Sequence, residues 1–217
     1  MRINIYCEGD TEKGLDVLLA PVREQLRGKG LSLNTRPLAN NSQLLRKIGN
    51  LTKNEISLGA PAVFCLIDLY NIYGALPQEL ARILANRNWA GLTVERRLHW
   101  LRTNIPRHCI DEEFREKFHI HFAVYEIEAL IFADPGKIKT RLGMRSIKSY
   151  INPEGINDMN SPANKLNELF RTHSKKRKYI KTVDGVKLLS SLDFNLVYQK
   201  CPNFAAFVDD ILSIQPR

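Results

Sequence analysis

The sequence lacks both long apolar runs and paired cysteines. No apolar stretch reaches the roughly 18 residues that a membrane-spanning helix needs. The first eight residues, which end in Glu8, are too short and too soon acidic for a signal peptide. The four cysteines lie far apart with no Cys-x-x-Cys pair, which argues against a disulfide framework or a zinc site. These absences predict a soluble cytoplasmic protein without a membrane partner.

Basic residues outnumber acidic residues in this chain. Its 217 residues include 32 lysines and arginines against 23 aspartates and glutamates, which gives a net charge of +9. A positive balance favours an anionic partner, and nucleic acid is the commonest one. Many basic proteins bind nothing specific, however, so charge alone leaves the partner open.

Strand-like and helix-like segments alternate along the first 135 residues. Residues 61–68, PAVFCLID, form a continuous apolar run of the kind that suits a strand buried on both faces of a parallel sheet. The alternation predicts an α/β fold with a central, mainly parallel sheet. The expected strands are 2–7, 31–37, 61–68 and the start of 118–132, and the expected helices are 11–27, 42–56, 77–86 and 91–104.

The pattern of the sequence changes after residue 135. Strand-like segments no longer alternate with helix-like ones, and only helical patterns follow. We therefore expect an α/β core over residues 1–135 and a helical C-terminal extension, residues 136–217, packed on that core. The sequence contains no internal repeat and no low-complexity linker. The helices expected in the extension and just before it span 135–143, 161–172, 182–191 and 202–213.

Three apolar runs of the core end in carboxylates. Glu8 ends the first, Asp68 ends the third, and Glu126 and Glu128 follow the last. Ligands of open parallel sheets bind at the carboxyl ends of the strands, where these side chains could converge. Mg²⁺ prefers oxygen ligands and is usually held by one or two carboxylates with water and substrate phosphates. The sequence therefore predicts a catalytic Mg²⁺ or Mn²⁺ site formed by Glu8, Asp68 and Glu126 or Glu128.

The residues after Glu8 suit a phosphate. Gly9 lets the backbone or a substrate approach closely. A helix that starts at Thr11 would offer free N–H groups and a positive dipole end to an anion. Asp10 and Glu12 have a simpler explanation, because acids stabilise the start of a helix through its dipole.

The densest basic run is HSKKRKYIK, residues 173–181. Basic side chains around Tyr179 suit phosphate contact combined with base stacking. The alternative is a solvated helix face without a ligand. The residues expected to follow a nucleic-acid backbone are Lys165, Lys176, Arg177, Lys178 and Lys181.

Five segments of the chain resemble one known family. In order, they are CEGDTEKGL, LIDLYNIYG, YEIEALIFADP, PEGINDMNSPANKL and CPNFAAFVDDIL. They resemble a bacterial family described as domain of unknown function 4276, which is regarded as Toprim-like. The segment EGDTE also resembles the Toprim version in OLD-type nucleases, in which a strand, a Glu-Gly-x-Thr-Glu motif and a helix follow one another. The resemblance implies a Toprim- or Rossmann-like three-layer fold with residues 1–135 as its core.

The resemblance also implies roles for particular residues. The glutamate of the first Toprim motif acts in acid–base chemistry or metal binding, and that role falls on Glu8. The second motif is usually Asp-x-Asp and binds Mg²⁺. Here it reads Asp68-Leu69-Tyr70 without the second aspartate, so Glu126 or Glu128 could compensate, and Tyr70 could contact substrate. Such families often act beside an ATPase partner in phage-defence modules.

Three hypotheses for the function follow. The first is a Toprim-like, Mg²⁺-dependent nuclease that hydrolyses phosphodiester bonds of nucleic acid. The second is a non-catalytic adaptor that keeps the fold and binds nucleic acid or an ATPase, and the missing second aspartate supports it. The third is an enzyme acting on phosphate esters of nucleotides, which predicts turnover that DNA does not inhibit. The oligomeric state is left open.

Overall fold

Contacts divide the chain into two compact units. The computed structural model describes all residues except 10–12, 71, 86–87, 157–160, 175–176 and 217. The first unit contains residues 1–9, 26–122 and 214–217, and the second contains residues 10–25 and 123–213. The chain thus passes between the units more than once, and the predicted division after residue 135 stays a prediction.

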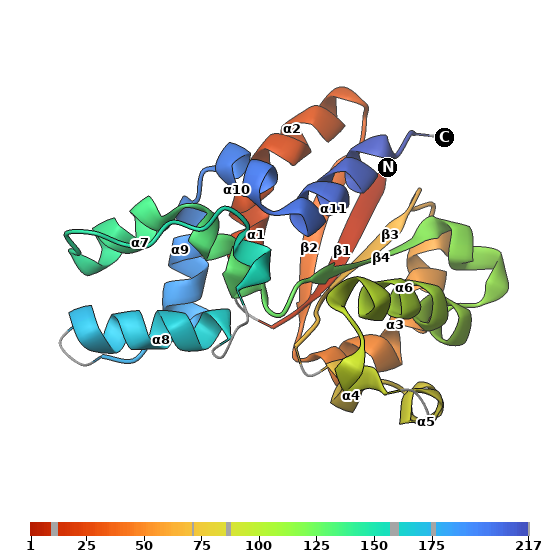
Figure 1. Cartoon of the computed structure of the whole chain (residues 1–217). Coiled ribbons are helices and arrows are strands. Elements are labelled where there is room, and N and C mark those ends of the chain that lie inside the picture. The colour runs from red at the N-terminus through yellow and green to blue at the C-terminus, as the bar shows by residue number, and fades with distance from the viewer. Residues whose placement is uncertain (10–12, 71, 86–87, 157–160, 175–176, 217) are drawn as a thin grey trace. The chain divides into compact units, whose positions relative to one another are not determined.

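A parallel four-stranded sheet is the frame of the first unit (Figure 1). The strands are ordered β2-β1-β3-β4, and the register of β1 pairs Cys7 with Pro37 of β2 and with Leu66 of β3. Residues 3–7 of the central strand β1 are all buried, as its apolar run requires. This sheet confirms the predicted α/β class and is consistent with a three-layer Rossmann- or Toprim-like fold. The strands are β1 (Arg2–Glu8), β2 (Ser32–Leu38), β3 (Val63–Asp68) and β4 (Phe118–Ala123).

The longest helix of the first unit, α3 (Asn41–Ser57), packs against β1 and β3. It buries Leu44 and Ile48 on one face, and the Asn40 side chain caps its start by accepting a hydrogen bond from the Gln43 N–H. The predicted helices 42–56, 77–86 and 91–104 are confirmed with small shifts of their ends. The other helices of this unit are α4 (Ile72–Ala75), α5 (Gln78–Ala85), η1 (Trp89–Gly91), α6 (Val94–Cys109) and η2 (Glu112–Lys117).

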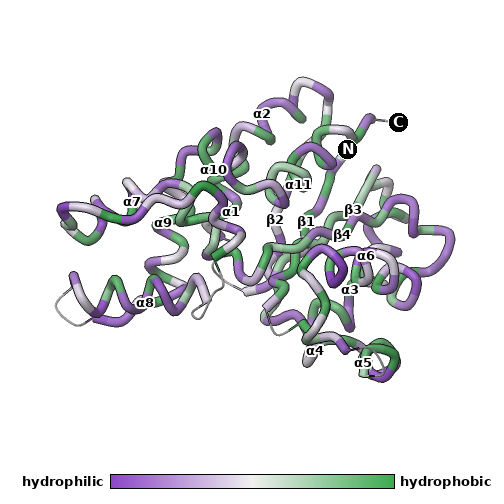
Figure 2. Tube along the Cα trace, viewed as in Figure 1, coloured by the Kyte–Doolittle hydropathy of each residue, from purple (hydrophilic) through white to green (hydrophobic). Residues whose placement is uncertain are grey.

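Apart from Ala123 at the end of β4, the described residues of the second unit form helices and the segments that connect them. Hydrophilic and hydrophobic residues alternate along its helix α8 (Pro162–His173) (Figure 2), which buries Leu166 and Phe170. The four helices predicted after residue 134 are confirmed, and the short α10 (Phe194–Lys200), which the sequence patterns did not reveal, lies between two of them. The remaining helices are α1 (Lys13–Leu18), η3 (Ile127–Ala133), α7 (Pro135–Leu142), η4 (Pro153–Gly155), α8 (Pro162–His173), the π-helix η5 (Lys181–Gly185), α9 (Val186–Ser191), α10 (Phe194–Lys200) and α11 (Pro202–Ser213).

The helix predicted over residues 11–27 is divided in the structure. It forms α1 and α2 (Ala20–Gly28), which are separated at Leu19. Pro21 explains the division, because proline donates no backbone hydrogen bond to the residue four positions earlier, Val17, and is tolerated only in the first turn of a helix, where α2 has it. Within the second unit, α1 packs closely on α9. A Cβ atom on Gly14 would lie 2.6 Å from Cβ of Leu189, so this packing needs glycine.

No helix in the described part of the chain is long and apolar enough to cross a membrane.

Candidate functional site

Glu8 and Asp68 are the last residues of two neighbouring strands in the first unit. Because Cys7 is paired with Leu66 and both strands run in the same direction, β1 and β3 end at the same edge of the sheet. Both carboxylate side chains are half-buried there. The structure thus places these two predicted ligands at the ends of adjacent strands, at the edge where ligands of parallel sheets bind, and their joint role in metal binding stays a prediction.

The turn after β1 depends on Gly9. Its φ of +74° lies in the left-handed region, which side chains other than glycine rarely adopt. Its N–H donates to the Leu38 carbonyl at the end of β2, over 2.6 Å. This bond fixes where the chain leaves the sheet beside Glu8. The predicted contact between Gly9 and a substrate stays a prediction.

Asn41 completes this edge of the sheet, and the sequence analysis missed it. It is the first residue of α3 and only 6% exposed, and its Nδ2 donates to the Asp68 carbonyl over 3.2 Å. Its Oδ1 is buried and accepts no hydrogen bond from any residue that the structure describes. A buried polar atom without a partner costs about 1–3 kcal/mol. The available signal was a pair of asparagines, Asn40 and Asn41, directly before the predicted helix 42–56. We call Glu8, Asp68 and Asn41 the carboxylate edge.

An aromatic side chain follows the carboxylate edge. Tyr70, which stands where the Toprim pattern has its second aspartate, is 46% exposed, and Tyr73 in α4 is 41% exposed. Tyr70 is therefore accessible to a ligand from solvent. Its predicted contact with substrate stays a prediction.

Glu126 and Glu128 meet in the second unit around Lys181. The Lys181 Nζ lies 3.5 Å from Glu126 Oε1 and 3.2 Å from Glu128 Oε1. Glu126 Oε2 also accepts a hydrogen bond from the Ala163 N–H at the start of α8, over 2.9 Å. Tyr179 donates its hydroxyl to Glu128 Oε1 over 3.5 Å. These acids, predicted as metal ligands, are thus neutralised in part by a lysine that was predicted to bind phosphate.

Glu128 is the most deeply buried member of this cluster, with no exposed surface. Burial raises the pKa of Glu128, the Lys181 ammonium opposes that shift, and the negative charge of Glu126 adds to it. The Glu128 Oε2 accepts no hydrogen bond within the described ranges. Burial also raises the pKa of the Tyr179 hydroxyl, and the charge of Glu128 adds to that shift. A metal-binding role for Glu126 and Glu128, and their convergence with Glu8, stay predictions.

Arg177 has a structural partner in the second unit. Its two terminal nitrogens each donate to a carboxylate oxygen of Asp184 over 2.8 Å, and Arg141 adds a third contact over 3.2 Å. Asp184 has no exposed surface. Burial disfavours its charge, but hydrogen bonds from Arg177, from the Ile180 N–H and from Arg141 lower its pKa below the ordinary value. This bidentate pair holds the start of η5. In the folded protein the Arg177 guanidinium is therefore already paired with the Asp184 carboxylate and not with a phosphate.

The other predicted residues are distributed as follows. Lys178 is exposed to solvent, and Lys165 lines a pocket of the second unit. Thr11 and Lys176 lie outside the described residues, as do Asp10 and Glu12. Within the part of the chain that the structure describes, no group of three His, Cys, Asp or Glu side chains is arranged to hold a metal ion.

The fold and the carboxylate edge define a parallel α/β protein with acidic side chains at the ends of adjacent strands. The family model described as Domain of unknown function (DUF4276) matches residues 7–212, and the chain belongs to this family. Neither a curated protein nor a solved structure matches the chain.

Proposed function

We propose that this protein is a Toprim-like, Mg²⁺-dependent nuclease whose metal site is the carboxylate edge. The observation that supports it is the placement of Glu8 and Asp68 at the ends of neighbouring parallel strands, beside the buried unpaired oxygen of Asn41. The net charge of +9 suits a polyanionic substrate. A cytoplasmic location, expected from the sequence, belongs to the same proposal. So does an ATPase partner in a phage-defence module, which rests on the resemblance alone.

The residues of the carboxylate edge fit a hard divalent cation. They offer two carboxylates and an amide oxygen, the oxygen ligands that Mg²⁺ and Mn²⁺ prefer, and no thiol or imidazole. A cation would also give the buried Asn41 Oδ1 the partner that it lacks among the described residues. Bound there, the metal would polarise a phosphodiester and favour its attack by water.

The side chains of the carboxylate edge would then have separate tasks. Asp68 and Asn41 would hold the cation, and the Asn41 hydrogen bond to the Asp68 carbonyl would keep the two ligands in place. Glu8 would hold the cation or accept the proton of the attacking water. The water oxygen would form a bond to phosphorus, the bond to the leaving oxygen would break, and that oxygen would take a proton from solvent.

Hydrolysis of labelled DNA and RNA with Mg²⁺ tests this function. Glu8→Gln and Asp68→Asn keep the size of each side chain and remove its charge, and we expect each to lower the rate by roughly 100-fold or more. Glu116→Gln removes an exposed carboxylate of the same unit from η2 and should leave the rate unchanged. Equal cleavage by all four proteins would refute the assignment.

The second candidate is a non-catalytic adaptor, and one observation favours it. Tyr70 replaces the second aspartate of the usual metal motif and is exposed. An adaptor would bind nucleic acid without cleaving it, and Glu8→Gln would leave that binding intact. Undetectable hydrolysis combined with unchanged binding in Glu8→Gln would therefore put the adaptor ahead of the nuclease.

A further inference from the structure

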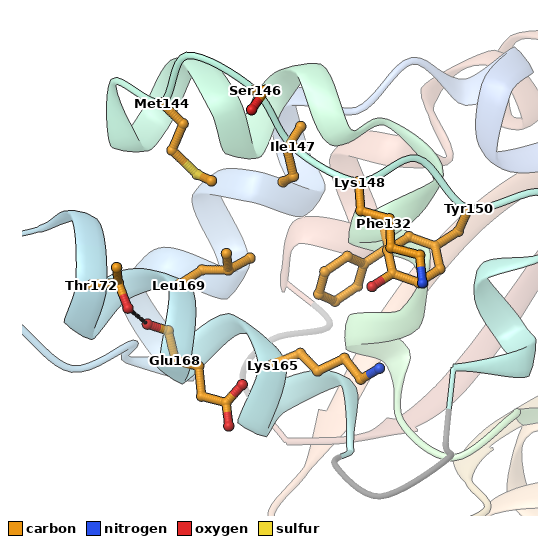
Figure 3. Close-up of a pocket in the computed structure, with 10 residues that line it drawn as sticks. All are labelled: Phe132, Met144, Ser146, Ile147, Lys148, Tyr150, Lys165, Glu168, Leu169 and Thr172. Carbon is orange, nitrogen blue, oxygen red and sulfur yellow. Dashed lines mark hydrogen bonds between the residues drawn. The ribbon is translucent and has the colours of Figure 1, made fainter.

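An open pocket of ≈ 720 Å³ lies within the second unit (Figure 3). Its walls come from η3, from α8 and from the chain that follows α7. Pockets that bind small molecules usually have volumes of about 300–1,000 Å³. None of its lining residues belongs to the carboxylate edge, so the pocket is a separate candidate site.

Two lysines converge on one aromatic ring in this pocket. The Nζ atoms of Lys148 and Lys165 lie 5.1 and 5.9 Å from the centroid of the Tyr150 ring. Figure 3 shows the two side chains reaching that ring from different elements. Neither ammonium forms an ion pair with a carboxylate among the residues described. The ring attracts both cations, and an anion that binds beside the ring would be attracted by both ammonium groups.

The Tyr150 ring, near which both lysines lie, packs against a buried aromatic side chain. Phe132 is 1% exposed and meets Tyr150 edge to face, with centroids 5.5 Å apart and an angle of 76° between the ring planes. Such edge-to-face pairs are a preferred geometry of aromatic side chains. Tyr150 is therefore supported from behind, and a ligand meets a largely pre-formed wall.

The rest of the pocket suits a ligand larger than an isolated anion. Met144 and Leu169 form an apolar wall away from the lysines (Figure 3). Glu168 lines the pocket as well and would accept hydrogen bonds from hydroxyl or amino groups. A ligand that uses all three features carries a negative head, a flat or apolar body, and hydroxyl or amino donors. A nucleotide has this combination.

We propose that this pocket binds a nucleoside monophosphate group. Lys148 and Lys165 hold its phosphate beside Tyr150, the base lies against Met144 and Leu169, and Glu168 accepts from the sugar or the base. The same group could be a free mononucleotide or the 5′-phosphorylated end of a nucleic acid. The inference goes beyond the proposed nuclease activity and does not depend on it.

Calorimetric titration of the full chain in EDTA tests the pocket without any metal. The probes are AMP, adenosine and a 5′-phosphorylated tetranucleotide. We expect AMP to bind at least 10-fold more tightly than adenosine, because only AMP carries the phosphate. Lys148→Gln and Lys165→Gln should each raise the Kd for AMP about 10-fold, the effect of losing one charge-assisted contact. Lys139→Gln, an exposed lysine of the same unit, should leave the Kd unchanged.

The two sources of the phosphate give different results. Tighter binding of AMP than of the tetranucleotide assigns the pocket to a free nucleotide, and the reverse order assigns it to a nucleic-acid end. No binding of AMP or the tetranucleotide, or equal Kd values in wild type and both lysine variants, would overturn the proposal. Because the titration contains EDTA and follows binding alone, a failure of the proposed metal site does not change its outcome.

Discussion

Removal of the Lys181 ammonium should destabilise the protein in a pH-dependent way. Lys181→Met keeps the unbranched apolar part of the side chain, removes the ammonium and leaves Glu126 and Glu128 beside each other without their cation. At an effective dielectric constant of about 20, each contact of 3.2 or 3.5 Å corresponds to about 5 kcal/mol of attraction. The Lys181 side chain is 47% exposed, so screening by water and its own desolvation cost reduce the net effect. We expect a loss of about 2–3 kcal/mol in the free energy of unfolding at neutral pH.

The sign of the pH dependence follows from Glu128. Its pKa is raised in the folded state, so the folded protein binds a proton more readily than the unfolded chain, and stability falls as pH rises through that window. Lys181 opposes the shift, so its removal raises the pKa of Glu128 further. The stability difference between wild type and Lys181→Met should therefore be smallest near the ordinary glutamate pKa and should grow toward neutral pH.

Urea unfolding of the variant at a series of pH values measures this difference. Lys187→Met, which changes an exposed lysine of α9, is the matched control and should stay near wild type throughout. Adding Glu128→Gln to Lys181→Met removes the uncompensated charge and should recover most of the loss at neutral pH. A loss that does not change with pH, or that is equal in Lys187→Met, would refute the reasoning.

Two further predictions concern packing and charge within the second unit. Gly14→Ala should lower the free energy of unfolding by about 1–3 kcal/mol, because the new Cβ would lie 2.6 Å from Cβ of Leu189. Gly28→Ala is the control, since Gly28 has open space around it, and a thermal unfolding assay should show no loss of stability for this variant. Asp184→Asn should cost about 3 kcal/mol at neutral pH, because it leaves Arg177 without its buried partner. Since the pKa of Asp184 is lowered in the folded protein, the stability difference between wild type and Asp184→Asn should shrink as pH falls below the ordinary aspartate pKa. Chemical unfolding measures this difference, and a difference that stayed constant at acid pH would contradict the account.

The sequence predicted the sheet and its acidic edge for a simple physical reason. Buried parallel strands appear as continuous apolar runs, and a polar residue at the end of such a run marks the carboxyl edge of the sheet. Glu8 and Asp68 could be assigned in this way without knowledge of the strand order. The strand order then added what the sequence could not provide, namely that β1 and β3 are neighbours.

The basic run was harder to interpret, because its meaning depends on contacts distant in sequence. Arg177 and Lys181 look like free charges in the sequence, but Lys181 meets acids more than fifty positions away, and Arg177 bonds to Asp184 across a π-helix start that periodicity does not reveal. Asn41 was missed for a similar reason. Its buried oxygen becomes informative only once the end of β3 lies beside it.

Mn²⁺ binding followed by electron paramagnetic resonance, in the presence of a DNA oligonucleotide, tests the central claim most directly. It needs neither the natural substrate nor a partner protein. The account predicts one stoichiometric site in wild type and in Glu116→Gln that is lost in Glu8→Gln and in Asp68→Asn. Equally weak binding in all four proteins would contradict the metal site, and so would a site that survives both edge variants and disappears in Glu126→Gln.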